Sequence, residues 1–308
     1  MTVGIVFSNG LEAIVIADTQ VTRGGRELVC EKIFAFSGKN YHGAVISSGI
    51  QDQSNWFAAN LKNHREDDID KFIHNIYAEY QNDSEESEKR SLNRIKKEIE
   101  RAYSIIPNKD ARDRLIYAKL CEFVGEFEQL KDALNTEFIL PVYDKKKKRI
   151  RIFGIDKDCY ETMNNIVVIG NGKDAADVYV GTSLDSISFE KLSKEDLLYF
   201  AINAHAFSTL NTGVGSTPEI VYISKDKAVK LNSEIGVICA NLSGAYLSRY
   251  NKEFTAKEFK GYLKGVLDGK NEVYGKIASK LGLNALTLTT MVIPHSSWQA
   301  AANRKNFL

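Results

Sequence analysis

The chain has 308 residues, and its 41 basic and 40 acidic residues give a formal net charge of +1. A hydrophobic content of 44% and a charged content of 26% are typical of a globular protein and exclude a disordered or fibrous chain. Without a basic surplus, nucleic acid is not expected as the main partner. No apolar run approaches the ~20 residues of a membrane span, so no membrane association is expected.

The first residues lack the basic and apolar stretches of a secretory signal, which favours a cytoplasmic protein. The four cysteines lie far apart and include no Cys-x-x-Cys pair, and the five histidines show no ligand spacing. We therefore expect no disulfide framework, no metal site and no cofactor.

Residues 2–48 contain four short apolar runs, and the Asn-Gly pair at 9–10 is a strong hairpin-turn signal. Two consecutive antiparallel hairpins are therefore expected. From residue 52 to about 134, apolar residues recur at three- and four-residue spacing, which predicts helices. The polar residues 81–90 predict a bend or an exposed helix start, and Pro107 predicts a break.

Strands are expected again at 137–143 and 149–155, and we interpret the basic run 145–149 between them as a solvated hairpin turn rather than a nucleic-acid patch. The remaining predicted elements are a strand at 165–169, a helix at 174–180, a helix at 195–210 capped by Ser193, strands at 219–223 and 228–231, and helices at 235–250 and 256–267. Runs of strands followed by runs of helices favour an α+β fold.

The second residue carries the first chemical signal. Because Thr2 is small, Met1 is expected to be removed, which would leave the amine of Thr2 free. An α-amine has a reference pKa of about 7.7–8.0, so it can accept the proton of its own hydroxyl, and one residue then supplies both nucleophile and base. Met-Thr alone is a weak signal. It gains weight from Asp18, which ends the second apolar run, and from Lys32, which opens the third.

These residues resemble the proteasome β-type subunit family of the N-terminal-nucleophile (Ntn) hydrolase superfamily. The motifs are an N-terminal Thr followed by segments 18–24 (Asp-Thr-Gln-Val-Thr-Arg-Gly), 32–34 (Lys-Ile-Phe) and 47–52 (Ser-Ser-Gly-Ile-Gln-Asp). Single-ring bacterial members that begin Met-Thr are nearest in this stretch. The resemblance covers residues 2–60 and about 136–231, where it includes the Gly-Asn-Gly turn at 170–172.

The resemblance implies a four-layer αββα sandwich of two antiparallel sheets, the Ntn hydrolase fold, and a threonine endopeptidase that forms an acyl ester on Thr2. Lys32 would lower the pKa of the Thr2 hydroxyl and amine, and Asp18 would pair with Lys32 and orient it. The backbone N–H of Ser48, with Gly49 beside it, would donate to the oxyanion.

Ser48 stands where the family has a Gly, and three further positions depart from the family pattern. Asn171 stands where the family has the Ser of a Gly-Ser-Gly turn, and Thr209 and Thr212 align with the Asp and Ser of its Asp-x-x-Ser-Gly motif. Asn171 and Thr209 can still form hydrogen bonds, but neither residue supplies the carboxylate that supports the terminal amine in the family. Slow, specialised or lost activity therefore all remain open.

Substrate-binding positions also follow from the resemblance. Thr22 matches a residue that binds the substrate main chain. The positions of the specificity pocket are all apolar: Val21, Cys30, Phe34, Ile46 and Ile50. An apolar pocket favours a large apolar side chain before the scissile bond. The alternative, that these five residues pack in the core, is equally open.

Other interpretations compete with the peptidase. The pattern Gly170-x-Gly172-x-x-Ala175 fits a loose dinucleotide fingerprint, but no following strand ends in the acid that such a site needs. A catalytically weak or inactive structural subunit would fit the missing polar partners. A peptide ligase or amidase would use the same ester with an amine as acceptor.

The resemblance also implies an organisation and partners. Residues 1–231 would form the hydrolase core, enlarged by helices at about 52–134, and residues 232–308 would form a helical C-terminal extension. The substrate would be a peptide or an unfolded protein. A homo-oligomer such as a ring, served by an ATPase unfoldase, is the expected assembly.

Overall fold

The computed structural model describes most of the chain, namely residues 3–23, 26–29, 31–49, 51–61, 63–64, 66–131, 136–156, 158, 160–184, 187–209, 214–250 and 254–305. Side chains are not described at 20–23, 26–29, 51–52, 87, 91, 124–131 and 303–305. The predicted site residues Thr2, Cys30, Ile50 and Thr212 lie outside the described residues.

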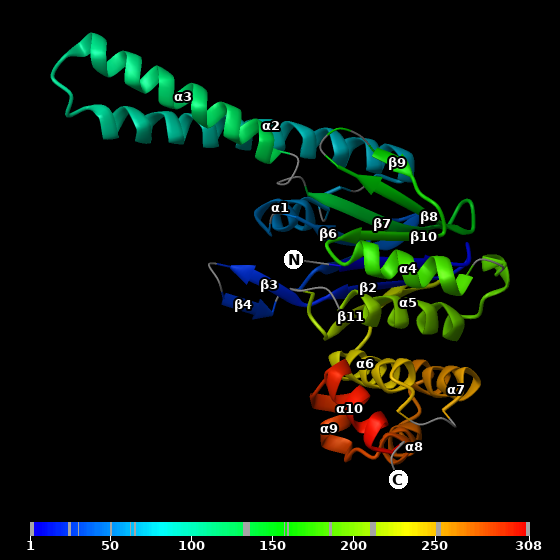
Figure 1. Cartoon of the computed structure of the whole chain (residues 1–308). Coiled ribbons are helices and arrows are strands. Elements are labelled where there is room, and N and C mark those ends of the chain that lie inside the picture. Colours follow the sequence, from blue (N-terminus) through cyan, green and yellow to red (C-terminus); the bar gives the residue numbers. More distant parts are fainter. Residues whose placement is uncertain are drawn as a thin grey trace.

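Two five-stranded antiparallel sheets form the centre of the molecule (Figure 1). The first sheet has the order β10-β1-β2-β11-β12 and consists of β1 (Val3–Ser8), β2 (Ala13–Asp18), β10 (Ile166–Gly170), β11 (Pro218–Ile223) and β12 (Ala228–Lys230). The second sheet has the order β5-β6-β7-β8-β9 and consists of β5 (Ile33–Ser37), β6 (Tyr41–Ser48), β7 (Glu137–Asp144), β8 (Arg149–Ile155) and β9 (Tyr160–Thr162).

Local sequence explains the hairpins of both sheets. Gly10, with a φ of 86°, closes the β1–β2 turn in a conformation that suits glycine. The predicted hairpins β1–β2, β5–β6 and β7–β8 are confirmed by their antiparallel registers. The short polar strand β9 and the ribbon of β3 (Gln20–Arg23) and β4 (Arg26–Val29) were not predicted. Polar residues give these short pairs no apolar alternation to mark them.

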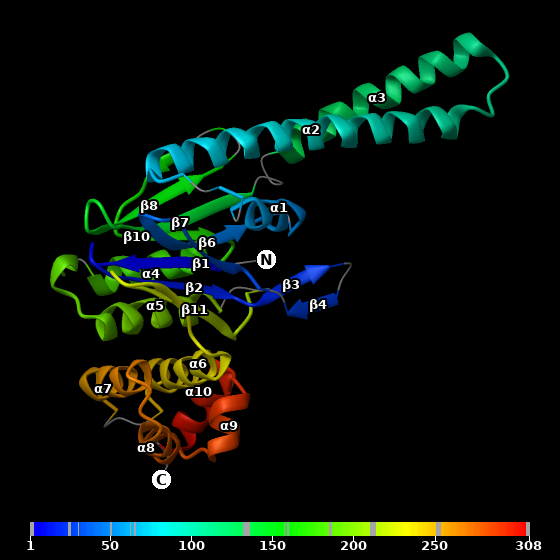
Figure 2. The ribbon, with the colours of Figure 1, turned by 180° about the vertical axis from the view of Figure 1, so that it is seen from behind.

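Helices cover the outer face of each sheet, as two opposite views show (Figures 1 and 2). The helices α1 (Gln51–Leu61) and α2 (Ile69–Tyr103) pack on the second sheet through a buried aromatic cluster that includes Phe57, Phe72 and Phe138. The helices α4 (Lys173–Leu184) and α5 (Lys194–Ser208) pack on the first sheet. Apolar residues fill the space between the sheets. The predicted four-layer αββα sandwich is therefore confirmed.

The capping box predicted for α5 is also present. The Ser193 side chain accepts from the backbone N–H of Asp196, and the Asp196 carboxylate accepts from the backbone N–H of Ser193. Between α4 and α5 lies a single 3-10 turn, Phe189–Lys191.

The helix α2 corrects one prediction. Residues 81–90 are not a bend, because α2 continues through them for 35 residues in total. The pairs Glu85–Lys89 and Glu86–Arg90 lie one turn apart and support helical structure there. The break predicted at Pro107 is present, since α2 ends at Tyr103 and α3 (Lys109–Lys131) begins after it.

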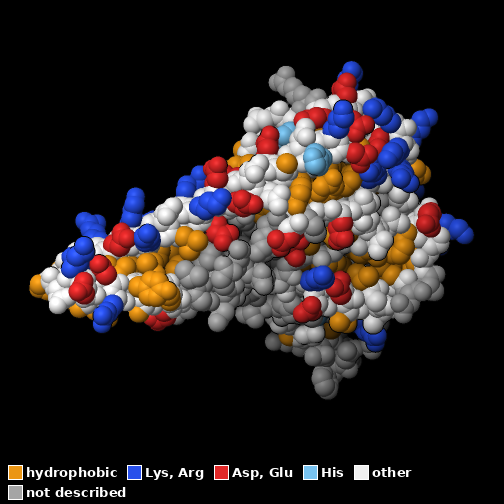
Figure 3. Space-filling view, turned by 90° about the horizontal axis from the view of Figure 1, so that it is seen from above, with side chains coloured by type: hydrophobic (Ala, Val, Ile, Leu, Met, Phe, Trp, Pro, Cys, Tyr) orange, Lys and Arg blue, Asp and Glu red, His pale blue; other side chains and the backbone are white. Residues whose placement is uncertain are grey.

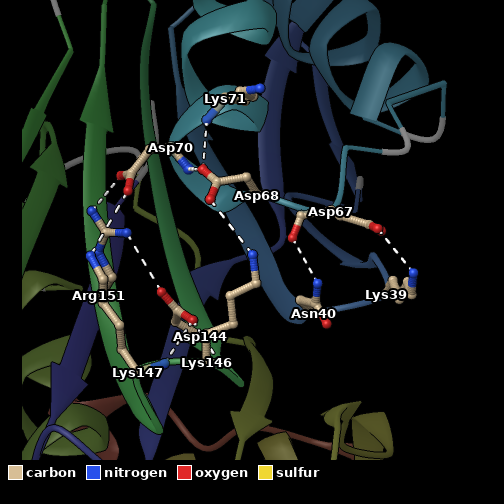
Figure 4. Close-up of polar contacts among 10 residues, drawn as sticks. All are labelled: Lys39, Asn40, Asp67, Asp68, Asp70, Lys71, Asp144, Lys146, Lys147 and Arg151. Carbon is tan, nitrogen blue, oxygen red and sulfur yellow. Dashed lines mark hydrogen bonds and ion pairs between the residues drawn. The ribbon is translucent and has the colours of Figure 1, made fainter.

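Acidic residues at the start of α2 meet the basic β7–β8 turn (Figure 4). Arg151 donates to Asp70 at 2.6 Å, and this hydrogen bond lowers the pKa of Asp70. Lys146 lies 3.7 Å from Asp68, which also caps α2. Lys147 and Asp70 are 3.9 Å apart. The turn is thus paired with acidic residues of the same chain, in line with our interpretation of the basic run as a structural turn.

The C-terminal residues add a further layer below α5 (Figure 1). They form α6 (Ser233–Leu247), α7 (Ala256–Leu267), α8 (Glu272–Leu281), α9 (Ala285–Thr290) and α10 (His295–Lys305). Their buried side chains join the same apolar cluster as α4, α5 and the outer face of the first sheet. Across the described part of the chain, no helix combines the length and apolar character needed to cross a membrane.

Candidate active site

The Asp18 carboxylate, at the C-terminal end of β2, is fully buried and joins three parts of the chain. Its Oδ1 accepts from the backbone N–H of Val3 at 2.9 Å and from the Lys32 ammonium at 2.9 Å. Its Oδ2 accepts from the backbone N–H of Gly215 at 3.1 Å. A carboxylate with three such donors is held in one orientation.

A second buried carboxylate fixes the backbone of the lysine. Glu219, on β11, accepts from the backbone N–H groups of Lys32 at 2.9 Å and Ile33 at 3.1 Å. The other Glu219 oxygen pairs with Lys230, which also pairs with Glu31. The Lys32 side chain is thereby positioned from its backbone as well as from Asp18. Glu219 cannot be identified from the sequence, because a glutamate at the start of a strand carries no signal of its partner 187 positions away.

His205 lies on α5 and is fully buried near the pair. Its Nε2 has no hydrogen-bond partner. Burial lowers the pKa of His205 to about 4, while the Asp18 charge acts in the opposite direction and the Lys32 charge acts in the same direction. The imidazole is therefore neutral at pH 7. The spacing of the five histidines in the sequence does not single out His205.

Ser48 is the last residue of β6, and Gly49 follows it. The end of β6 and the start of β1 lie at the same edge of the sandwich (Figure 2). Gly49 has a φ of 133°, a conformation that favours glycine. Ser48 is buried, and it lies on the same face of β6 as Ile46, which packs between the sheets. At Gly4, an added Cβ would come within 2.7 Å of the Ile46 side chain, so the two sheets approach closely beside this edge.

Asn171 and Thr209, two positions at which the sequence departs from the family that it resembles, lie near the ends of two different helices. Asn171 is exposed in the turn between β10 and α4. Thr209 is the C-cap of α5, and its hydroxyl donates to Ala206 O at 2.7 Å. The hydroxyl proton of Thr209 is thus engaged in a hydrogen bond within α5.

The predicted specificity pocket is described only in part. Val21 and Thr22 lie on β3, but their side chains are outside the described residues. Ile46 is buried between the sheets, whereas Phe34 packs toward the cluster below α1 and α2. Since Ile46 pairs with Ile33, the neighbouring Phe34 faces the opposite side of the sheet. The structure does not bring these two residues together in one pocket.

A cavity of about 440 Å³ opens near Ser48, between β10 and the ends of β7 and β8. Glu137, which pairs with Ser48 across β6 and β7, lines it. The lining also includes Asp156, Glu161, Asp177 and Lys173. This lining has an acidic excess and did not figure in the predicted pocket. Among the described residues, no cluster of three His, Cys, Asp or Glu side chains could hold a metal ion.

No family model matches the chain, and no curated protein matches it. Among the solved structures that are similar to it are two Anbu proteins. One is a mutant of Anbu from Hyphomicrobium sp. strain MC1, with 13% identity, a TM-score of 0.48, and coverage of 83% of this chain and 98% of the other. The other is Anbu, an ancestral beta-subunit, from Yersinia bercovieri, with 11% identity, a TM-score of 0.47, and coverage of 82% and 98%. The fold assignment itself rests on the strand order and layers of this chain.

Proposed function

We propose that this chain is a threonine-type Ntn hydrolase in which Thr2, freed by removal of Met1, attacks a peptide carbonyl. The observation that supports the proposal most directly is the hydrogen bond from Val3 N to Asp18 Oδ1, at 2.9 Å. Because Val3 follows Thr2, this bond holds the residue next to the nucleophile on the carboxylate that also binds Lys32. One carboxylate therefore ties the start of the chain to a buried ammonium group.

The chemistry follows from these charges. The α-amine of Thr2 takes the hydroxyl proton, and the oxygen bonds to the substrate carbonyl carbon. The buried positive charge of Lys32 stabilises negative charge on the Thr2 oxygen as the hydroxyl loses its proton. The backbone N–H of Ser48 donates to the developing oxyanion. The leaving amine then receives the proton as the peptide bond breaks, and water hydrolyses the ester on Thr2. The proposed substrate is a peptide or an unfolded protein chain.

The proposal is tested by intact-mass analysis of the full chain with a peptide epoxyketone. We expect a chain without Met1 that gains the mass of one inhibitor. Thr2→Ala should lose the adduct, whereas Thr290→Ala, an exposed threonine of α9, should keep it. A folded chain that retains Met1 and gains no adduct would overturn the proposal.

A weak or inactive subunit is the second candidate, and one observation favours it. Thr209 supplies no carboxylate to the terminal amine, and its hydroxyl donates within α5. This candidate predicts processing of Met1 without adduct formation. A ligase would be recognised by a new amide product when a peptide amine is added to the acyl-enzyme. The proposed ring assembly and its ATPase partner rest on the sequence resemblance.

A further inference from the structure

The helices α2 and α3 form an arm that projects beyond the sandwich (Figures 1 and 2). Tyr80 is the last buried residue of α2, and from residue 81 to 123 no described side chain is buried. We use "the arm" for residues 81–131. Its part in α2, residues 81–103, is about 35 Å long at 1.5 Å per residue.

Two helices alone do not cover the apolar face of the arm. Apolar residues recur at helical spacing on both helices and are only half-buried: Leu92, Ile95, Ile99 and Tyr103 on α2, and Ile116, Leu120 and Phe123 on α3. Further apolar side chains face solvent, with exposed fractions of 84% for Ile105, 46% for Leu115 and 72% for Tyr117. Figure 3 shows hydrophobic side chains along the arm between charged ones. A hollow of about 430 Å³ lies between the helices beside Ser104 and Tyr117.

The charges of the arm are divided along its length. The outer half, residues 93–120, has eight basic and four acidic residues. The inner half, residues 81–92 and 121–131, has three basic and seven acidic residues. The two halves therefore carry opposite excesses of four charges, and the arm as a whole is neutral. Surface pairs such as Glu85–Lys89 lie within the inner half and leave this division intact.

We propose that the arm pairs with the arm of a second copy of this chain, antiparallel and about a two-fold axis. This arrangement places the basic outer half of each arm against the acidic inner half of the other. It also covers the apolar face with two more helices, as in a four-helix bundle. A parallel arrangement would instead bring like charges together.

The size of the surface agrees with this occupant. Two helices about 10 Å wide and about 35 Å long present roughly 700 Å² per copy. The pair would bury about 1,400 Å², within the usual range of specific interfaces. Nucleic acid would fit only the basic outer half and would be repelled by the acidic inner half, so the whole length of the arm favours a second copy.

Charge reversal tests the proposal in the full chain by sedimentation at several protein concentrations. Lys96→Glu with Lys97→Glu removes the excess of four positive charges from the outer half and should raise the dissociation constant of one association step about tenfold or more. Glu85→Lys with Glu86→Lys likewise removes the acidic excess of the inner half and should weaken association in the same way. A mixture of the two variants should associate more tightly than either variant alone, because a basic outer half then faces an acidic inner half again. The matched control, Lys225→Glu with Lys227→Glu in the β11–β12 turn, should associate like the unchanged chain. The far-ultraviolet circular dichroism of each variant reports whether it folds.

The native thiol of Cys121 gives a second readout, because it is exposed and lies at the boundary of the two halves. The two-fold axis should bring two Cys121 residues together, so a short bismaleimide should link two chains in a Cys30→Ser, Cys159→Ser background. Cys121→Ser should abolish this link. Unchanged association after either pair of substitutions, or no tighter association in the mixture of the two variants, would overturn the proposal. So would a monomeric chain that binds a DNA duplex through Lys96 and Lys97. Epoxyketone labelling of the charge variants tests the active site separately. Failure of the arm proposal and failure of the proposed function can therefore be distinguished.

Discussion

The Asp18–Lys32 pair is costly to bury, and this cost bears on its role. Both side chains are almost completely removed from water, at 0% and 5% exposure. Replacement of a buried ion pair by apolar residues is often neutral or stabilising, so the pair is weak support for a purely structural role. Asp18 offsets the desolvation by accepting from two backbone N–H groups as well. The burial of this pair therefore supports the proposed chemistry at Thr2 more than it supports a purely structural role.

Lys32→Met should both destabilise the chain and abolish epoxyketone labelling. Removal of the ammonium leaves the Asp18 carboxylate buried without its counter-charge, which costs about 3–5 kcal/mol. The double variant Asp18→Asn, Lys32→Met carries no charge at either position of the pair and should recover part of this loss, while labelling stays absent. Urea unfolding of the three chains measures the effect. A double variant less stable than Lys32→Met would contradict this account of the pair.

His205 should make stability depend on pH. Its pKa is lowered from 6.5 to about 4 in the folded chain, so the unfolded chain binds the proton first. The stability due to the neutral imidazole is present above pH 6.5 and is lost as the pH falls toward 4, by roughly 3 kcal/mol in all. His205→Gln should therefore show a smaller loss between pH 7 and pH 5 than the unchanged chain, as measured by urea unfolding. His295→Gln is the control, because its burial lowers the pKa less. Equal pH dependence in the unchanged chain and His205→Gln would exclude this role.

At this scale, the sequence could pair Asp18 with Lys32 because the resemblance places both beside an N-terminal threonine. The sequence could not predict that Glu219 and His205 also belong to this site. Those side chains reach the site only because β11 pairs with β2 and α5 packs beneath β1 and β2. Such neighbours depend on tertiary packing, which local periodicity does not encode.

Among the elements, prediction was most successful where apolar alternation and turn chemistry agreed. The β7–β8 hairpin has a run of buried residues on either side of a polar turn, and its bounds were predicted closely. The continuous α2 was missed at 81–90 because polar residues on every face hide the helical period. Helical ion pairs, rather than an apolar stripe, accompany the helix there. An exposed arm needs less apolar patterning than a helix that lies on a sheet.

The capping box of α5 should contribute measurably to stability. Ser193→Ala removes the acceptor for Asp196 N and should cost about 1 kcal/mol. Ser188→Ala is a matched control, since Ser188 precedes the short 3-10 turn and makes no side-chain capping bond. It should change the free energy of unfolding by less than about 0.5 kcal/mol. Equal effects of the two substitutions in urea unfolding would show that the cap does not stabilise α5.

The whole molecule combines a sandwich with two additions that relate to it differently. The arm leaves the apolar core after Tyr80, so its helices depend on each other or on a partner. The C-terminal helices instead continue the core, because α6 and α7 pack on α5 within one apolar cluster. The proposed division at residue 231 thus marks the end of the family resemblance in sequence. It does not mark a gap in packing.

Trp298→Ala tests whether the C-terminal helices and the sandwich unfold together. Trp298, on α10, is buried against Tyr250 and next to Gly244 of α6, so truncation leaves a large cavity that should cost about 3–5 kcal/mol. The chain has two tryptophans, so Trp56 on α1 then becomes the fluorescent probe on the far side of the sandwich. If the molecule is one cooperative unit, the urea midpoint reported by Trp56 should fall with that of the circular dichroism. Leu286→Ala, at a 73% exposed position of α9, should leave both midpoints unchanged. A Trp56 midpoint that stays constant while helical signal is lost earlier would show that residues 232–308 unfold as a separate domain.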